Sequence, residues 1–335
     1  MKICISDSML YGKKVLVTGA GGFIGSHLIE RLVKEGCKVR AFVKYNKGKC
    51  GNIDLLQNDV KEKIEIIFGN VIDSDAVRRA AKNIEIIFHL AALVSIPYSY
   101  SHPREVIETN VLGTLNVLIA GKENKVEKII HTSTSEVYGT AQYVPIDENH
   151  ILQAQSPYSA SKIAADKIAE SFYRSYNLPV AIIRPFNQYG PRQSARAVIP
   201  TIITQALTSD AIRLGTLTPT RDFTYVLDTV DAFIKIAESP NSIGEVINIG
   251  SGFEISIGDL AKKIISIIGR DVKIVSEELR VRPEKSEVIR LLADIKKAKK
   301  LLGWEPKISL DEGLKKTIEW ISKSLNLYKP GKYEI

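Results

Sequence analysis

Residues 14–25 of the chain read KVLVTGAGGFIG, and this stretch decides the fold. It opens with the β-rich run Lys14–Thr18, which is typical of a buried strand. Glycines stand at positions 19, 22 and 25 of the turn that follows, and Ser26–Glu35 then repeats apolar side chains at helical spacing. A strand, a glycine turn and an amphipathic helix in this order predict the first unit of a parallel sheet covered by helices.

The same alternation continues through the first half of the chain. Further strands are predicted at Lys38–Val43, Ile64–Phe68, Ile84–His89, Lys128–Thr132 and Val180–Arg184. Helices between them are predicted at Asp75–Lys82, Pro103–Glu123 and Pro157–Tyr176. The strands are continuously apolar rather than alternating, as strands covered on both faces are. We therefore expect an α/β fold built on a doubly wound parallel sheet.

After Phe186 the pattern changes, because turn signals multiply and the elements become shorter and mixed. Helices are predicted there at Ile257–Ile268, Asp294–Leu302 and Leu310–Ser324, and a strand at Glu245–Ile249 that returns to the main sheet. We expect a dinucleotide-type domain at residues 10–186 and a smaller mixed α/β lobe at residues 187–330, with a cleft between them. Ligands of such sheets bind outside the carboxyl ends of the strands.

The composition is that of an ordinary globular protein. Of 335 residues, 44% are hydrophobic and 25% are charged, which excludes disorder and a disulfide scaffold. No uncharged apolar stretch approaches the roughly 18–20 residues of a membrane span, and no apolar leader precedes Lys14. The three cysteines follow no metal-ligand spacing, and an odd count suits a reducing compartment. We expect no metal, no membrane partner and a cytoplasmic location.

The chain carries 46 Lys and Arg against 38 Asp and Glu, a net charge of +8. Basic character is compatible with nucleic acid, a membrane surface or an anionic small molecule. The densest run, residues 296–300, lies beside Leu301 and Leu302 in a helical pattern, so we interpret it as a solvated helix face. We expect no nucleic-acid partner.

The glycine turn predicts dinucleotide binding. Gly19, Gly22 and Gly25 allow a tight turn, close approach of backbone N–H groups to a pyrophosphate, and close packing of helix on strand. The second strand runs into Lys44 and Asn46 without the carboxylate that usually binds the ribose 2′-hydroxyl. Lys44 favours a 2′-phosphate, whereas Asn46 favours the hydroxyls of NAD. NAD is the cofactor we predict, with NADP as the open alternative.

Tyr158 and Lys162 stand four residues apart at the start of a predicted helix, so they share one helix face. A phenol with a pKa of about 10 is a poor base at neutral pH, but a nearby ammonium stabilises the phenolate and lowers that pKa. The pair is typical of a base that takes a proton from an alcohol while hydride leaves the same carbon. The competing interpretation is an ordinary surface contact between the two side chains.

Three polar residues, Thr134, Ser135 and Glu136, follow the strand predicted at Lys128–Thr132. Hydroxyls at the carboxyl end of a central strand can hydrogen-bond the same alcohol that Tyr158 deprotonates. A carboxylate at Glu136 can move a proton at a second carbon of the substrate. The alternative for Glu136 is a carboxylate that caps a loop.

At this point the sequence resembles the extended short-chain dehydrogenase/reductase family of nucleotide-sugar enzymes, in its 4,6-dehydratase and epimerase group. The resemblance covers nearly the whole chain, and its motifs are Thr18–Gly25, His89–Ala92, Asn110, Tyr158 with Lys162, Arg184–Asn187, Arg221–Phe223 and Leu301–Trp304. It implies an N-terminal Rossmann domain and a C-terminal lobe that binds a nucleotide diphosphate-sugar. It also implies a homodimer that pairs the helices at Pro103–Glu123 and Pro157–Tyr176.

The resemblance assigns binding residues at both ends of the cleft. The cofactor set is Gly19, Gly22, Phe23, Ile24, Gly25, Lys44, Asn46, Asn70, Val71, Leu90, Ala91, Ala92, Asn110, Tyr158 and Lys162. Arg221 and Arg282 correspond to diphosphate-binding arginines, and arginine forks match phosphate oxygens. Asn187 corresponds to a phosphate-contacting asparagine, and Arg196 is a further candidate for the substrate.

Residues 134–136 separate the activities within the family. The resemblance implies small or apolar residues there in 4-epimerases, and Ser-Glu or Asp-Glu in 4,6-dehydratases. UDP-glucuronate decarboxylases also carry Ser-Glu. Residues 132–148, 155–162 and 190–200 look most like the bacterial N-acetylhexosamine 4,6-dehydratases of legionaminic-acid-type pathways. Ser135 stands where glucose 4,6-dehydratases have an aspartate acid, so Glu136 is the candidate for both proton steps.

We therefore predict an NAD-dependent 4,6-dehydratase that acts on UDP- or GDP-N-acetylglucosamine and yields the 4-keto-6-deoxy sugar nucleotide. Its reaction is oxidation at C4, elimination of water across C5 and C6, and return of hydride to C6, with Thr134, Ser135, Glu136, Tyr158 and Lys162 as catalytic candidates. The alternatives are a UDP-sugar 4-epimerase and a UDP-glucuronate decarboxylase. A non-catalytic dinucleotide-binding regulator is the alternative from another class.

Overall fold

A computed structural model of the protein describes residues 8–328, so the last two residues of the lobe predicted at 187–330 lie outside the described part. A seven-stranded sheet forms its centre, in the order β10-β6-β5-β4-β1-β2-β3. The strands are β1 (Lys14–Thr18), β2 (Lys38–Val43), β3 (Ile64–Phe68), β4 (Ile86–His89), β5 (Lys128–Thr132), β6 (Val180–Pro185) and β10 (Val246–Ile249). All neighbours pair in parallel, which confirms the doubly wound sheet.

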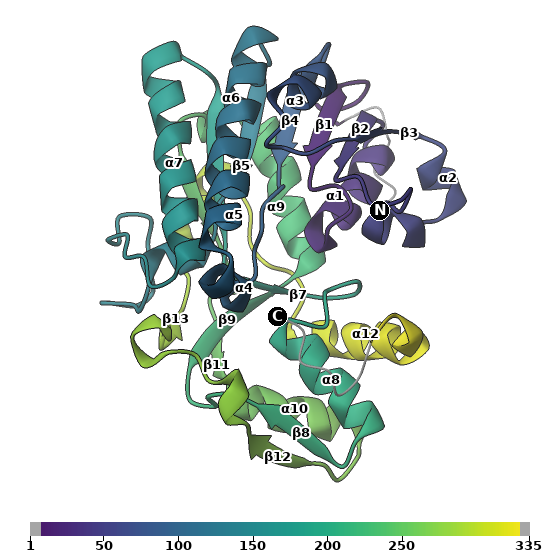
Figure 1. Ribbon diagram of the computed structural model, residues 1–335, viewed down its shortest axis with the longest axis vertical. Coiled ribbons are helices and arrows are strands. Elements are labelled where there is room, and N and C mark those ends of the chain that lie inside the picture. The colour runs from purple at the N-terminus through teal and green to yellow at the C-terminus, as the bar shows by residue number, and fades with distance from the viewer. Residues whose placement is uncertain (1–7, 329–335) are drawn as a thin grey trace.

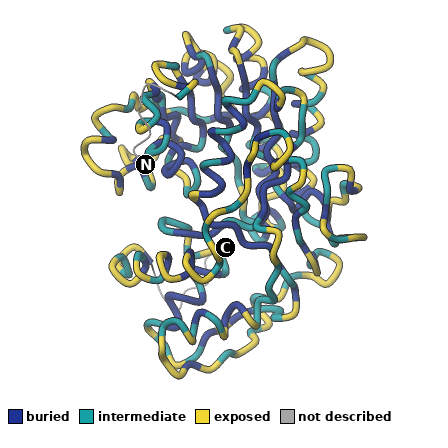
Figure 2. The backbone as a smooth tube through the Cα atoms, turned by 180° about the vertical axis from the view of Figure 1, so that it is seen from behind, coloured by how far each residue is buried: buried dark blue, intermediate teal, exposed yellow. Residues whose placement is uncertain are grey.

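Helices cover both faces of this sheet (Figure 1). One face carries α1 (Phe23–Lys34), α9 (Val226–Glu238) and α11 (Lys296–Leu302) over a core that includes Leu28 and Phe233. The other face carries α3 (Ser74–Ala81), α6 (Gly113–Glu123) and α7 (Pro157–Tyr176). Each fully buried Leu, Ile or Phe side chain contributes about 1.5–3 kcal/mol relative to an exposed one. Figure 2 shows the buried backbone concentrated in this sheet.

Strand β3 differs from the expectation that every strand is covered on both faces. It lies at the edge of the sheet, and its Ile66 and Phe68 are 36% and 41% exposed. The expectation is therefore wrong for β3. Edge strands and central strands can both be apolar. The composition of a strand therefore does not predict its position in the sheet.

The predicted helix at Pro103–Glu123 is interrupted. It consists of α5 (Pro103–Ile107), a π-helical turn at Glu108–Leu112, and α6. Such a turn widens the helix by one residue and often marks a functional region. Here the turn carries Asn110, whose side chain bonds the backbone N and O of Leu93 and the hydroxyl of Ser161.

The smaller lobe lies at the carboxyl ends of the main strands, at the bottom of Figure 1. Its strands are β7 (Asn187–Tyr189), β8 (Ala211–Leu214), β9 (Thr220–Tyr225), β11 (Glu254–Ser256), β12 (Lys273–Ser276) and β13 (Arg290–Leu291). Its helices are α8 (Val198–Thr208), α10 (Ile257–Ile268) and α12 (Leu310–Lys323), packed around one apolar core. The short helices α2 (Asn58–Lys61) and α4 (Ile96–Ser101) complete the chain.

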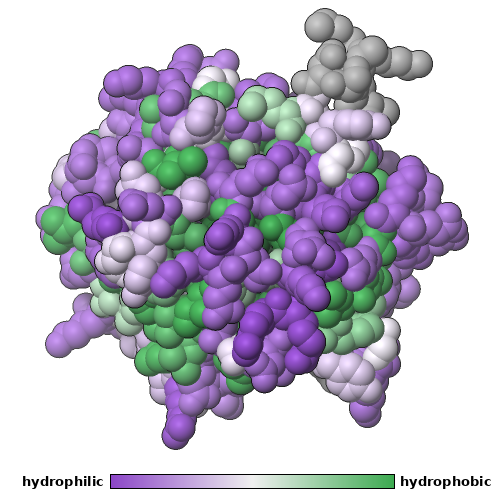
Figure 3. All heavy atoms as spheres, turned by 90° about the horizontal axis from the view of Figure 1, so that it is seen from above, coloured by the Kyte–Doolittle hydropathy of each residue, from purple (hydrophilic) through white to green (hydrophobic). Residues whose placement is uncertain are grey.

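The surface seen from above in Figure 3 carries mostly hydrophilic side chains with smaller apolar patches between them. Within residues 8–328, no helix has the length and apolar character that crossing a membrane requires. The lysine-rich run of residues 296–300 forms most of α11, and Lys296, Lys297 and Lys299 each pair with a carboxylate. The run is therefore a solvated and ion-paired helix face, as its pattern indicates.

Candidate active site

A cavity of about 1100 Å³ lies where the carboxyl ends of the main strands meet the smaller lobe. This is the place where ligands of doubly wound sheets bind. The cavity brings together all but two of the residues that the sequence nominates: Gly19, Gly22, Phe23, Ile24, Gly25, Lys44, Asn46, Asn70, Val71, Leu90, Ala91, Ala92, Thr134, Ser135, Glu136, Tyr158, Asn187, Arg196, Arg221 and Arg282. Lys162 and Asn110 do not line it.

The glycine turn is packed so tightly that side chains are excluded from it. A Cβ on Gly25 would stand 2.3 Å from the carbonyl oxygen of Gly19, and a Cβ on Gly19 would stand 2.7 Å from the backbone N of Ala91. Gly19 also has φ +70°, a conformation that side chains rarely adopt. Gly22 is the N-cap of α1 and offers no side chain to its N–H groups. The free N–H groups of this helix start form a cradle that suits a pyrophosphate.

A chain of buried hydrogen bonds holds the loop after β4 against this turn. Thr114 donates its hydroxyl hydrogen to the carbonyl of Asn110, so its oxygen accepts from Nε2 of His89 at 3.0 Å. Nδ1 of His89 then accepts from the hydroxyl of Thr18 at 2.8 Å, and that oxygen accepts from the N–H of Ala91. Burial keeps the pKa of His89 well below its ordinary value, so the ring is neutral. Asn110 supports the cavity from behind.

Lys44, Asn46, Asn70 and Val71 line the end of the cavity at β2 and β3. Lys44 is largely exposed, with its Nζ 4.0 Å from a carboxylate oxygen of Glu105. The side chain of Asn70 accepts from the N–H of Ile72 and so shapes the turn after β3. No carboxylate among the described residues lines this end of the cavity, which fits both a ribose hydroxyl and a 2′-phosphate.

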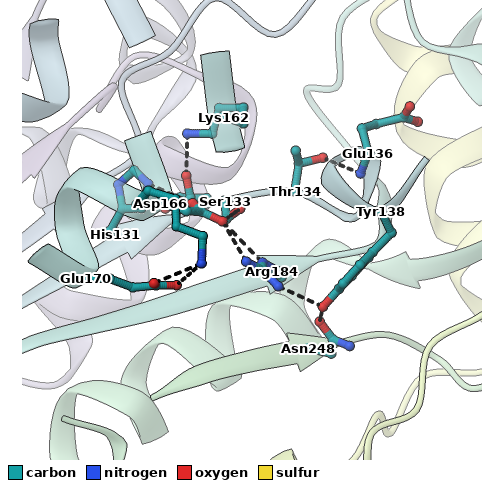
Figure 4. Close-up of polar contacts among 12 residues, drawn as sticks. His131, Ser133, Thr134, Glu136, Tyr138, Lys162, Asp166, Glu170, Arg184 and Asn248 are labelled. Carbon is teal, nitrogen blue, oxygen red and sulfur yellow. Dashed lines mark hydrogen bonds and ion pairs between the residues drawn. The ribbon is translucent and has the colours of Figure 1, made fainter. Parts of the chain in front are cut away.

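The residues after β5 form a short 3₁₀ turn, Ser135–Tyr138, that Thr134 caps. The Thr134 hydroxyl accepts from the N–H of Glu136 at 3.3 Å. The side chain of Glu136 is only 9% exposed, yet its carboxylate accepts no hydrogen bond from any described residue. Figure 4 shows this carboxylate turned away from Thr134 and from the buried polar cluster behind β5. Glu136 is therefore an unpaired carboxylate that faces the cavity.

Tyr158 and Lys162 lie on the buried face of α7, which begins behind Ser156 and Pro157 with a capping box. Tyr158 is 6% exposed and lines the cavity. Lys162 is 3% exposed, and its Nζ donates to the carbonyl of Thr132 at 2.6 Å. Burial lowers the pKa of Lys162 from 10.5 to about 8, and the charge of Asp166 opposes this fall.

The prediction that the pKa of Tyr158 is lowered is wrong for the protein chain without a bound cofactor or substrate. Burial raises the pKa of Tyr158 above its ordinary value, and the charges of Glu136 and Asp166 raise it further. The interaction with Thr134 acts in the opposite direction but is outweighed. The physical reason is that a buried site excludes the water that would stabilise a phenolate. Additional positive charge at the site is needed to form one.

Sequence reasoning missed a buried polar cluster directly behind these residues. The carboxylate of Asp166 accepts from the hydroxyl of Ser133 at 2.7 Å and from Nε2 of His131 at 3.2 Å. Arg184 donates to the same carboxylate through two nitrogens, at 2.9 and 3.2 Å (Figure 4). A signal was present, because Asp166 follows Lys162 by four residues and therefore shares its helix face.

The lobe side of the cavity carries a group of positive charges around one carboxylate. Arg221 is buried, with an Nη2 nitrogen 3.2 Å from Glu287, and an Nη1 nitrogen of Arg282 lies 3.6 Å from the same carboxylate. The charge of Glu136 also acts on Arg221, so two guanidinium groups face two carboxylates in this part of the cavity. The side-chain oxygen of Asn187 and Nη1 of Arg282 are buried without a hydrogen-bond partner among the described residues. Orphaned polar atoms beside two arginines suit a diphosphate.

Glu287 was not nominated by the sequence, because nothing in its local pattern sets it apart. Arg196 lines the cavity before α8, as expected. Within residues 8–328, no group of three His, Cys, Asp or Glu side chains is arranged to hold a metal ion.

Comparison with known proteins identifies the family. Residues 16–317 match the model of the family described as GDP-mannose 4,6 dehydratase. The chain belongs to this family.

Relatives that resemble the chain along most of its length differ in their named activities. The putative UDP-glucose 4-epimerase of Methanocaldococcus jannaschii is 33% identical over 92% of this chain and 99% of that protein. The dTDP-D-glucose 4,6-dehydratase of Bos taurus is 34% identical over 95% and 91%. The UDP-N-acetyl-alpha-D-glucosaminuronate decarboxylase of Bacillus cytotoxicus is 36% identical over 94% and 99%.

Solved structures of the family resemble the fold over its full length. The dTDP-glucose 4,6-dehydratase DesIV of Streptomyces venezuelae, solved with NAD and TYD bound, is 27% identical with a TM-score of 0.87, over 96% of this chain and 100% of that chain. The UDP-glucose 4-epimerase of Thermotoga maritima, solved with UDP-glucose, is 33% identical with a TM-score of 0.85, over 93% and 99%. The chain is thus a member of a family of nucleotide-sugar dehydratases, epimerases and decarboxylases with a Rossmann domain.

Proposed function

We propose that the protein is an NAD-dependent nucleotide-sugar 4,6-dehydratase that converts UDP- or GDP-N-acetylglucosamine to the 4-keto-6-deoxy sugar nucleotide. The observation that carries the proposal is the unpaired carboxylate of Glu136, which shares the cavity with Tyr158. A 4-epimerase needs a base for one alcohol only. A dehydratase also needs a group that takes a proton from C5, and Glu136 is free to do so.

The glycine cradle and the loop after β4 form the proposed dinucleotide site. The N–H groups at the start of α1 suit the pyrophosphate, and Asn46 and Asn70 line the end of the cavity that we assign to the adenosine. NAD, when bound, supplies a hydride acceptor that is regenerated within one turnover, and a positive charge. The presence of NAD in the solved structure of DesIV supports this assignment. Lys44 keeps NADP as an alternative.

Tyr158 is the proposed base for the C4 hydroxyl. Its hydroxyl lies in the cavity wall beside Thr134, which is placed to hydrogen-bond the same alcohol. Lys162 lies one helical turn further along α7 and holds a buried positive charge below about pH 8. This charge favours the phenolate form of Tyr158 over the phenol. Transfer of the C4 hydroxyl proton to Tyr158 is then coupled to the loss of hydride from C4.

Glu136 is the proposed group for the elimination. Once C4 is a ketone, the proton on C5 is acidic, and the carboxylate of Glu136 removes it. The carboxyl group so formed can donate its proton to the hydroxyl that leaves C6 as water. The hydride taken from C4 then returns to C6, and a proton from Tyr158 or from solvent returns to C5. Ser135 is buried in the same turn and lines the cavity, but a serine hydroxyl is too weak an acid to replace the carboxyl group here.

The lobe side of the cavity is the proposed site of the nucleotide diphosphate. Arg221 and Arg282 bring two guanidinium groups to Glu287, which neutralises only one of them. Asn187 and Arg196 line the same part of the cavity. A diphosphate can displace Glu287 from one arginine and gain charge-assisted hydrogen bonds from both.

A mass measurement tests the function. The purified protein with NAD is incubated separately with the two proposed substrates, UDP- and GDP-N-acetylglucosamine, and with UDP-glucuronate, and each product is analysed by mass spectrometry. Loss of one water from either substrate is the expected result. An isomer of unchanged mass indicates the 4-epimerase, and loss of carbon dioxide from UDP-glucuronate indicates the decarboxylase. No change with any of these substrates supports the dinucleotide-binding regulator.

We also propose a homodimer through α5, α6 and α7. These helices and the π-helical turn between α5 and α6 expose several large apolar side chains: Ile107, Leu112, Ile119, Tyr173 and Tyr176. Sedimentation of the purified protein at micromolar concentration tests it, with a dimer expected. Cys37 and Cys50 are free thiols, which supports the proposal of a cytoplasmic location.

A further inference from the structure

Asp166 is placed by helix register beneath the pair that carries the proposed oxidation. Tyr158, Lys162 and Asp166 follow each other at intervals of four residues along α7, so all three lie on one face. All three are buried, and Asp166 has no exposed surface at all. This face packs against the carboxyl end of β5, where Thr132 and Ser133 approach the cavity.

The carboxylate of Asp166 is fully engaged. It accepts four hydrogen bonds, one each from His131 and Ser133 and two from Arg184. Burial alone would raise the pKa of Asp166, but the bond from His131 and the charge of Arg184 outweigh it and lower that pKa to about 2. A fixed negative charge therefore stands behind β5 at neutral pH.

Among the described charges around Asp166, the ammonium of Lys162 has no ion-pair partner of its own. Asp166 and Arg184 form a buried ion pair. His131 and His89, stacked at 5.6 Å, have lowered pKa values because they are buried, so both rings are neutral. Lys162 forms no ion pair within the described residues, and its Nζ is bonded to the carbonyl of Thr132. Asp166 is the charge that favours its ammonium form.

We propose that Asp166 is a positioning residue for the proposed oxidation, which holds the Lys162 ammonium and the Thr132–Ser133 backbone in place behind Tyr158. The inference rests on the proposed function, since it assigns Tyr158 and Lys162 the redox step. Asp166 itself does not line the cavity, so it acts through Tyr158 and Lys162.

The groups that face this charge from the surrounding elements do not titrate near neutral pH. These groups are His131 of β5, Ser133 directly after β5, His89 of β4 and Arg184 of β6. The hydroxyl of Tyr138 accepts a hydrogen bond from Arg184 at 3.0 Å and donates one to the side-chain oxygen of Asn248 in β10. Glu136 faces Tyr158 from the cavity side. The alkaline limb of the pH profile therefore reports Lys162.

The test is the pH dependence of kcat/KM and the direct titration of Lys162, in wild type and in Asp166→Asn. Removing the negative charge should lower the pKa of Lys162 by about one unit or more below its wild-type value, because a buried cation loses its partner. The alkaline limb of kcat/KM should move down by the same amount. Nuclear magnetic resonance of protein labelled at lysine nitrogen follows the Lys162 titration without any substrate.

The matched control is Asp228→Asn, which makes the same chemical change at a buried carboxylate of α9 that bonds the N–H of Ile308 outside the cavity. This variant should be less stable, but the alkaline limb of its kcat/KM profile should stay at the wild-type pH. Asp166→Glu retains the charge and should also keep that limb. If Asp166→Asn fails to fold because Arg184 is left unpaired, the double variant Asp166→Asn with Arg184→Met removes both charges and permits the same titration.

Two results separate the inference from the function on which it rests. An unchanged Lys162 titration in folded Asp166→Asn overturns the inference, whatever the enzyme catalyses. A shifted titration in a protein that transforms none of the sugar nucleotides upholds the electrostatic role of Asp166 and overturns the proposed function instead.

Discussion

Glu136 and Tyr158 share one wall of the cavity, and the charge of Glu136 changes the proton affinity of Tyr158. The charge of Glu136 raises the pKa of Tyr158, because two neighbouring anions in a buried site repel. Once the phenolate of Tyr158 has taken the proton of an alcohol, it is neutral, and Glu136 can act as the single anion. The site thus favours proton transfers that follow one another.

Glu136→Gln tests the division of labour between these two residues. The amide keeps the size of the side chain but cannot remove the C5 proton. We expect bound cofactor and C4 oxidation to persist, while dehydration slows by about 10²-fold or more, in line with the usual contribution of an acid–base group. Absorbance of the reduced cofactor and the mass of the product measure the two steps separately.

The matched variant is Glu287→Gln, at the cavity carboxylate that pairs with Arg221. It should change KM for the sugar nucleotide rather than the elimination step. Dehydration at the wild-type rate in Glu136→Gln would show that another group removes the C5 proton.

At the scale of elements, the active region depends on two departures from regular geometry. The glycine turn brings the start of α1 against the end of β1 and the loop after β4, at distances that only glycine allows. The π-helical turn at Glu108–Leu112 directs Asn110 inward, where it bonds Leu93 and Ser161 and so ties that loop to α7. Both features align elements that are distant in the sequence.

Gly25→Ala should disrupt the cradle, because the new methyl would stand 2.3 Å from a backbone oxygen that cannot move freely. We expect loss of dinucleotide binding of at least tenfold and a lower melting temperature, measured by calorimetric titration with NAD and by thermal unfolding. Gly258→Ala is the control, since its Cβ would meet ordinary contacts at 3.5 Å near the start of α10. Tight NAD binding by Gly25→Ala would contradict the assignment of the cradle.

At the scale of the whole molecule, the two lobes are joined beside the cavity by the loop at residues 190–193. Nε2 of His27 in α1 donates to the carbonyl of Pro191 at 2.9 Å, and its Nδ1 accepts from Arg192. Asn52 donates to the carbonyl of Arg192, and Tyr328 donates to that of Gln193, both at 3.0 Å. His27 thus links the glycine-turn helix to the lobe that carries the proposed substrate residues.

The pH dependence of stability follows from this link. Burial, reinforced by the charge of Arg192, lowers the pKa of His27 from 6.5 to about 3. Between these values the unfolded chain binds a proton that the folded chain does not, so stability falls as the pH drops from 6.5 towards 3. We expect this loss in chemical unfolding measured at pH 7, 6, 5 and 4, roughly a few kcal/mol in total.

His27→Gln retains a donor for Pro191 but has no charge to gain. It should flatten the part of the curve between pH 6.5 and 4, while the loss from Asp166, which occurs only below its ordinary pKa of 3.8, remains. An equally steep curve in His27→Gln would assign the effect to other groups.

The local pattern of the sequence accounts for most of the fold. The boundaries of β1, β2, β3, β5, α7 and α10 agree with those predicted, and all of these elements except β3 bury a stripe or a run of their own apolar side chains. The edge position of β3 and the π-helical turn at Asn110 were not predictable in this way. Both depend on which segments become neighbours, and periodicity within one segment does not record that.

By itself, the sequence determined the strand–glycine–helix unit, the shared face of Tyr158 and Lys162, and the placing of Glu136 at the end of a strand. These follow from covalent spacing and helix geometry. Only the tertiary structure decided the proton affinities: burial raises the pKa of Tyr158, lowers that of Lys162 and surrounds Asp166 with donors from β5 and β6. Proton affinity depends on the solvent and charges that surround a group in space, and those are supplied by residues far away along the chain.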